Sequence, residues 1–93
     1  MRIIWARPAR NDLFEIADFY RDLAPDFVDA VADHVEAAVM RLLTNPYLGP
    51  EIGDTRVRKW NVRGTPFMLI YVVRGREIEI RRVRHSSANW HET

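Results

Sequence analysis

The basic residues are the side chains of this sequence with the clearest chemical potential, and they are concentrated in its second half. Residues 55–85 carry nine arginines and lysines against Glu77 and Glu79, a net charge of +7. Residues 1–36 carry eight acidic residues against four arginines, a net charge of −4. Segregation of this kind indicates a basic surface that faces an anionic partner, either nucleic acid or an acidic peptide. Solvated basic residues along a sheet edge, where they oppose aggregation, would give the same pattern.

His85 is the one histidine placed where it could act as a catalytic base. Such a base needs a reacting hydroxyl and a partner that orients the imidazole, and the sequence indicates neither. A histidine at this place more often caps the end of a strand by hydrogen bonding. His34 is expected on the surface of a helix, and His85 and His91 with Glu92 lack a third ligand on a rigid element. We therefore expect no metal site and no cofactor.

Length and composition predict one soluble domain over residues 1–93. A chain of 93 residues fits one core and leaves no room for a second. It has no cysteine, which excludes disulfides, thiolate metal sites and a cysteine nucleophile. The longest apolar run, Phe67 to Val73, is far shorter than the ~20 residues that span a membrane. The N-terminal apolar stretch is too short for a signal peptide, so we expect a cytoplasmic protein with no membrane association.

Two helices are predicted between a short N-terminal strand and a loop rich in glycine and proline. Arg2 to Ala6 has the β-branched and aromatic residues typical of a strand. Pro8 suits the first turn of a helix over residues 8–22, in which apolar residues recur at helical spacing. A second apolar stripe runs from Val28 to Leu43. Because the link is short, the two helices should form an antiparallel hairpin, and residues 46–54 should form a loop.

The rest of the chain has the pattern of three strands. Thr55 to Val62 is polar and basic. Phe67 to Val73 is continuously apolar and should be the central strand, covered on both faces. Arg74-Gly75 is a plausible two-residue hairpin turn, after which Arg76 to Arg84 should return as a strand.

The last predicted strand contains a break in its alternation. Ile78 and Ile80 point one way, but the next apolar residue is Val83, an odd step. A β-bulge near Arg81-Arg82 would restore the register. The element order β-α-α-β-β-β then predicts an α+β fold, in which a helix hairpin is packed on one face of a small, mainly antiparallel sheet.

This order, with particular residues in each element, resembles the RelE/ParE toxin superfamily along nearly the whole chain. The residues that carry the resemblance are, in chain order, Ala9, Asp12, Leu13, Ile16, Tyr20, Leu42, Leu43, Asn45, Pro46, Gly49, Arg56, Arg58, Lys59, Leu69, Ile70, Tyr71, Ile78, Ile80, Val83, His85 and Trp90. Each short group of these residues would be weak evidence for the family by itself, but their order and spacing together make the resemblance specific. It implies the toxin half of a type II toxin–antitoxin pair.

Within the superfamily, Val83-Arg84-His85 is more similar to the ParE branch, in which the last strand typically ends with valine, one residue and histidine. This resemblance implies a toxin that poisons DNA gyrase and a cognate ParD-like antitoxin that neutralises it. The antitoxin would wrap the toxin with its C-terminal segment and bind the promoter with its N-terminal domain, so contact with DNA would be only indirect. The ParE branch often has an arginine after the last strand, where this chain reads Ser86-Ser87-Ala88-Asn89.

Two alternatives stay open at this point, because fold alone does not choose a function. The RelE branch cleaves mRNA on the ribosome, which needs cations around the scissile phosphate and a group that activates the 2′-hydroxyl. The catalytic residues would then be Arg58, Arg82 and His85, since Tyr71 sits in the apolar central strand. Met68 stands where RelE-type sequences usually have an arginine. The other alternative is a non-toxic remnant that keeps only antitoxin binding.

Two sets of residues are expected to meet partners. The residues expected to bind the target or the antitoxin are Arg56, Arg58, Lys59, Arg82, Arg84, His85 and Trp90. Phe14, Phe19 and Phe27 should belong mostly to the core of the helix hairpin. The apolar stripes nevertheless look wide for two helices on one sheet, and the apolar surface left over, with these three phenylalanines, is the groove expected to bind an antitoxin helix.

Overall fold

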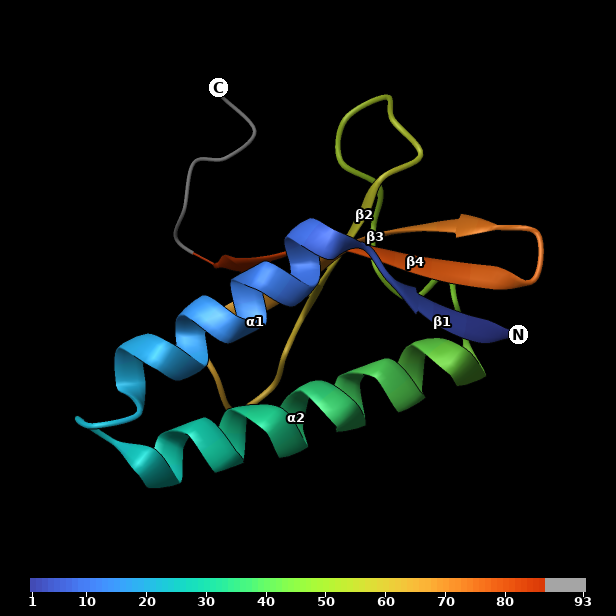
Figure 1. Ribbon diagram of the computed structural model, residues 1–93. Helices are drawn as coiled ribbons and strands as arrows, with labels where there is room; N and C mark the ends of the chain where they lie inside the picture. Colours follow the sequence, from blue (N-terminus) through green and yellow to red (C-terminus); the bar gives the residue numbers. More distant parts are fainter. Residues whose placement is uncertain (87–93) are drawn as a thin grey trace.

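The helices and strands of the computed structural model follow the predicted order and confirm the α+β fold class (Figure 1). The elements are β1 (Arg2–Trp5), α1 (Arg7–Tyr20), α2 (Pro25–Thr44), β2 (Arg58–Asn61), β3 (Phe67–Arg74) and β4 (Glu77–His85). The structure describes residues 1–86, so Trp90 lies outside the described residues. Within this range no helix combines the length and the apolar character that crossing a membrane requires.

The four strands form one sheet in the order β1-β4-β3-β2. The β2–β3 and β3–β4 pairs are antiparallel, whereas β1 runs parallel to β4. The predicted, mainly antiparallel sheet is therefore confirmed, with one parallel pair at its edge. This pair places the first described strand against the last one described, with Arg2 opposite Glu77 and Trp5 opposite Ile80.

The core lies between the two helices and one face of the sheet. Alternate residues of a strand point to opposite faces, and Leu69 and Tyr71 of β3 are fully buried beside Ile78 and Ile80 of β4. Helix α2 contributes Val31, Val35, Ala38 and Leu42 to the same cluster. Both helices lie on this side of the sheet (Figure 1), as the hairpin prediction requires.

The opposite face of β3 is also buried, although neither α1 nor α2 covers it. Met68, Ile70 and Val72 are each almost inaccessible to water. Ile70 lies opposite Lys59 on one side and Arg82 on the other, and cross-strand partners share a face of the sheet. The aliphatic stems of such long basic side chains can cover apolar neighbours while their charged ends stay in water. The prediction that both faces of the central strand are covered is confirmed.

The predicted β-bulge is present at Arg81. Ile70 pairs with Arg82 and Tyr71 pairs with Ile80, so Arg81 has no partner on β3. The extra residue changes the alternation of β4, and this is why Val83 is buried with Ile80 despite their odd spacing.

Two predicted boundaries are wrong. The hairpin turn is Gly75-Arg76 rather than Arg74-Gly75, because Arg74 still pairs with Glu77. Gly75 has φ +57°, and a positive φ at the first turn residue matches the twist of two-residue hairpins. The strand predicted from Thr55 begins only at Arg58, because the Thr55 N–H and hydroxyl both donate to the carbonyl oxygen of Ile52 and form a turn.

Candidate functional site

Helix α1 takes the place of a strand beside the second half of β4. The last backbone hydrogen bond on the β1 side runs from Ala6 N–H to the Ile80 oxygen, and β4 continues to His85. Beyond that point Asp12 of α1 accepts a hydrogen bond from the Val83 N–H at 2.9 Å. A backbone N–H buried without a partner would cost about 1–3 kcal/mol. Asp12 therefore satisfies a donor that the short β1 leaves without a strand partner.

The same carboxylate holds Arg82 with two hydrogen bonds. Nε and Nη2 of Arg82 lie 2.8 Å from Oδ2 and Oδ1 of Asp12. The Asp12 side chain is 11% exposed and that of Arg82 38%. The hydrogen bond to Asp12 raises the pKa of Arg82 above its ordinary value. The sequence predicts a binding or catalytic role for Arg82, and the structure gives its guanidinium an internal partner.

Arg58 is also engaged within the protein. One of its terminal nitrogens donates to the carbonyl oxygen of Gly49 at 2.7 Å, and the other to Glu51 at 3.1 Å. The guanidinium carbon lies 5.0 Å from the centre of the Tyr47 ring. With 19% of its side chain exposed, Arg58 ties the loop between α2 and β2 to the sheet.

The Tyr71 hydroxyl also anchors the loop between α2 and β2 to the sheet. Its hydroxyl donates to the carbonyl oxygen of Pro46 at 2.8 Å and accepts from the Gly49 N–H at 2.9 Å. Burial raises the pKa of Tyr71 above its ordinary value of 10.0. The buried, fully bonded phenol fits the expectation that Tyr71 is a poor catalytic candidate.

The other predicted binding residues remain near the surface. Arg56 and Lys59 are exposed, and Arg84 is half-buried opposite Met68 on the outer face of the sheet. His85 is exposed at the end of β4, with its ring edge-on to Phe67 and the ring centres 5.9 Å apart. The structure therefore does not gather Arg58, Arg82 and His85 into one catalytic cluster, because each contacts a different part of the fold.

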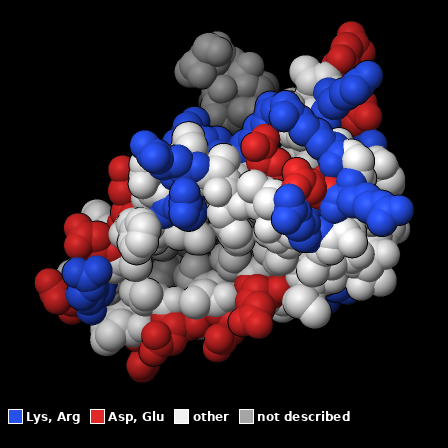
Figure 2. All heavy atoms as spheres, turned by 45° about the vertical axis from the view of Figure 1, so that its right-hand side comes forward, with Lys and Arg blue, Asp and Glu red and all other residues white. Residues whose placement is uncertain are grey.

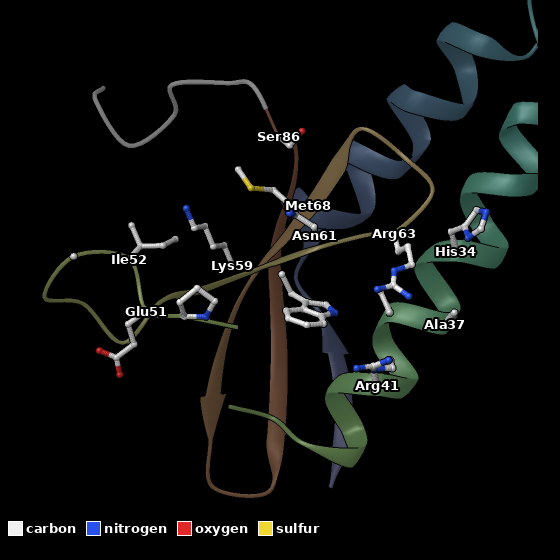
Figure 3. A pocket seen from close by; sticks show the side chains of 14 residues that line it. His34, Ala37, Arg41, Glu51, Ile52, Lys59, Asn61, Arg63, Met68 and Ser86 are labelled. Atoms are coloured by element: carbon white, nitrogen blue, oxygen red, sulfur yellow. The ribbon is translucent and has the colours of Figure 1, made fainter. Parts of the chain in front are cut away.

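A basic hollow of about 1030 Å³ lies beside β2 (Figure 3). The ionisable residues that line it are His34, Arg41, Glu51, Lys59 and Arg63. The one acid among these five is already paired with Arg58. Carboxylates or phosphates are the chemical groups that this hollow can attract.

Sequence reasoning finds Lys59 in this hollow but misses His34, Arg41 and Arg63. These residues come from α2 and from the loop between β2 and β3, which meet only in the folded chain. A Cβ on Gly64 would lie 2.8 Å from the His34 ring, so the glycine lets the loop approach α2 closely. Among the described residues no cluster of three metal-ligating side chains exists.

A second, apolar depression of about 570 Å³ runs between the two helices, and we name it the α1–α2 groove. It is visible in Figure 2 as a hollow among uncharged side chains. The residues that line it are Trp5, Arg10, Leu13, Phe14, Ile16, Ala17, Val28, Val31, Ala32, Val35, Glu36 and Val39. Ten of these twelve are uncharged, so the groove can accept an apolar stripe of another helix.

The three phenylalanines expected at such a groove have different positions. Phe14 lines the groove, whereas Phe27 packs between Tyr20 and Phe67, with ring centres at 4.7 and 6.4 Å. Phe19 is not among the lining residues, because five helical residues rotate a side chain about 140° from Phe14. The prediction that Phe14 and Phe19 belong to the hairpin core is wrong, since their side chains are 72% and 66% exposed.

Comparison with known proteins shows the family. Residues 3–90 match the family described as the ParE toxin of the type II toxin–antitoxin system parDE. The structure is similar to a chain of the chromosomal ParDE toxin–antitoxin system from P. aeruginosa, with a TM-score of 0.78 and 28% sequence identity. That similarity covers 91% of this chain and 95% of the other. No curated protein matches the sequence. The chain belongs to the ParE toxin family of type II toxin–antitoxin systems.

Proposed function

We propose that this chain is a cytoplasmic toxin that poisons DNA gyrase and that a cognate ParD-like antitoxin neutralises it. The family match over residues 3–90 is the observation that carries the proposal. The geometry of the basic residues adds support. A toxin that acts by binding needs surfaces, and the chain presents both a basic hollow and an apolar groove.

The alternative of a ribosome-dependent mRNA endonuclease receives less support from the same residues. Arg58 and Arg82 would have to stabilise a phosphate, but each already makes charged hydrogen bonds to a carboxylate of the chain. Met68 lines the basic hollow at the place where RelE-type sequences usually have an arginine. A nuclease would have to break internal pairs before it could use either guanidinium.

Purified protein, titrated into a DNA gyrase supercoiling reaction, tests the target. We expect inhibition accompanied by accumulation of cleaved DNA, and we expect the cognate antitoxin to reverse both effects. No inhibition at a large molar excess would exclude gyrase. Mapping of mRNA 5′ ends after induction would then separate a nuclease, which gives cuts in phase with codons, from an inert remnant, which leaves the map and growth unchanged.

The α1–α2 groove is the surface that we propose for the antitoxin. Its apolar lining and its position between two helices suit the apolar face of an amphipathic helix. An exposed apolar groove on a small chain is also the kind of surface that a tight partner covers. The exposed Phe14 ring at this groove would be buried on binding.

Phe14 and Phe19 provide a matched pair of variants for this surface. Both are exposed on α1, but Phe14 lines the groove and Phe19 does not. We expect Phe14→Ala to weaken antitoxin binding about 5- to 30-fold, as loss of a buried aromatic anchor does, while Phe19→Ala changes it less than about twofold. Isothermal titration calorimetry measures both. Equal effects of the two substitutions would place the antitoxin elsewhere.

A further inference from the structure

The α1–α2 groove has walls of opposite charge. Among the described residues that line it, two are charged: Arg10 on α1 and Glu36 on α2. Their side chains belong to different helices, so the positive charge borders one side of the apolar floor and the negative charge borders the other.

Neighbouring residues extend each charge along its helix. Residues three, four or seven positions apart share a face of a helix. Arg7 precedes Arg10 by three residues, and we name this pair the basic rim. Asp29 and Asp33 precede Glu36 by seven and three residues, and we name these three residues the acidic rim. All five residues are exposed. In Figure 2 the acidic side chains of the lower edge lie across the hollow from basic side chains above it.

A charged pair further along α1 is locally balanced. Asp18 and Arg21, towards the C-terminal end of α1, form a salt bridge with each other at 3.2 Å. They neutralise one another and leave the contrast between the two rims intact.

We propose that the two rims fix the direction in which the antitoxin helix lies in the groove; this inference rests on the proposed antitoxin binding at the same surface. A helix seated on the apolar floor has one flank beside α1 and the other beside α2. Reversing the helix exchanges these flanks. The occupant is therefore an amphipathic helix whose apolar stripe lies on the floor of the groove. It has acidic residues on the flank that meets the basic rim and basic residues on the flank that meets the acidic rim. The opposite direction places like charges together, which opposes binding.

Charge reversal of each rim separately tests this inference. We expect Arg10→Glu and Glu36→Lys each to weaken binding of the cognate antitoxin about 3- to 10-fold, because each replaces an attraction at the edge of an interface with a repulsion. An antitoxin helix with acidic residues on both flanks would bind Glu36→Lys more tightly. One with basic residues on both flanks would bind Arg10→Glu more tightly. Tighter binding of either variant overturns the proposal.

Matched controls separate the rims from the overall charge. Arg76→Glu in the β3–β4 turn and Asp54→Lys in the loop before β2 change the net charge by the same amounts at exposed positions outside the groove. We expect binding within about twofold of the unmodified chain for both. Control effects as large as those of the rim variants would show a general charge effect and would contradict a role of the rims.

A third variant distinguishes failure of this inference from failure of the proposed function. Ala32 is exposed on α2 and lines the groove, so Ala32→Arg places a long charged side chain on the apolar floor. We expect it to weaken binding more than 30-fold. If Ala32→Arg binds normally, the antitoxin does not use the groove and the proposed surface fails. If Ala32→Arg blocks binding but a rim variant binds more tightly, only the inference about direction fails.

Discussion

Replacing Asp12 with alanine should lower the free energy of unfolding by about 2–4 kcal/mol, although Asp12 lines neither the basic hollow nor the α1–α2 groove. The carboxylate accepts hydrogen bonds from the Val83 N–H and from two nitrogens of Arg82. Its removal leaves a buried backbone donor and a charged guanidinium without their acceptor. Since Arg82 is more than a third exposed, water recovers part of the loss. Urea denaturation followed by tryptophan fluorescence measures the change.

Asp18→Ala is the control for this experiment, because Asp18 lies on the same helix but makes only an exposed salt bridge with Arg21. We expect its effect to stay within about 0.5 kcal/mol. Adding Arg82→Met to Asp12→Ala should restore part of the lost stability by removing the unpaired charge. An Asp12→Ala variant as stable as Asp18→Ala would contradict the structural role of this pair.

The second large effect is expected at Gly49, where a side chain has no space. An ideal Cβ at this position would lie 2.3 Å from the carbonyl oxygen of Lys59 and 2.8 Å from the Tyr71 hydroxyl. Gly49→Ala must therefore push the loop away from β2 and weaken the hydrogen bonds that Tyr71 and Arg58 make to it. We expect a loss of about 2–4 kcal/mol and faster proteolysis within residues 46–54.

Gly53→Ala separates crowding from backbone strain in the same loop. Gly53 has φ +59° but nothing within 4 Å of an added Cβ. Its substitution should cost about 1 kcal/mol through conformation alone. If Gly49→Ala proved no more harmful than Gly53→Ala, the close approach of the loop to Lys59 would not matter for stability.

Local patterns were sufficient to predict most of the fold. The helices follow from apolar spacing and from prolines at their ends, and the odd step from Ile80 to Val83 predicted the bulge at Arg81. The prediction of a strand beginning at Thr55 was wrong, because the Thr55 hydroxyl donates a hydrogen bond to the Ile52 carbonyl oxygen and stabilises a turn. Side-chain bonds of this kind compete with strand formation without changing the apolar pattern.

The candidate site was harder to predict, because residue type shows what a side chain can bind but not whether the protein already binds it. Arg58 and Arg82 looked available in the sequence, yet their partners Gly49 and Asp12 lie in segments that only the fold brings near. Asp12 carries part of the family resemblance, but nothing in the sequence connects it with a residue 70 positions away. The wide apolar stripes of the two predicted helices indicated that some apolar surface would remain exposed. Which ring faces the groove depended on the rotation along α1, which separates Phe14 from Phe19.

The pairing of β1 with β4 has a consequence for synthesis of the protein. β1 can pair with β4 only after residues 77–80 have been synthesised. The hydrogen bond between Asp12 and the Val83 N–H can form only later still. Contacts between such distant segments form late and slow folding. Translation must therefore proceed past β4 before the sheet closes, so a ribosome that stops before β4 releases a chain without the complete toxin fold.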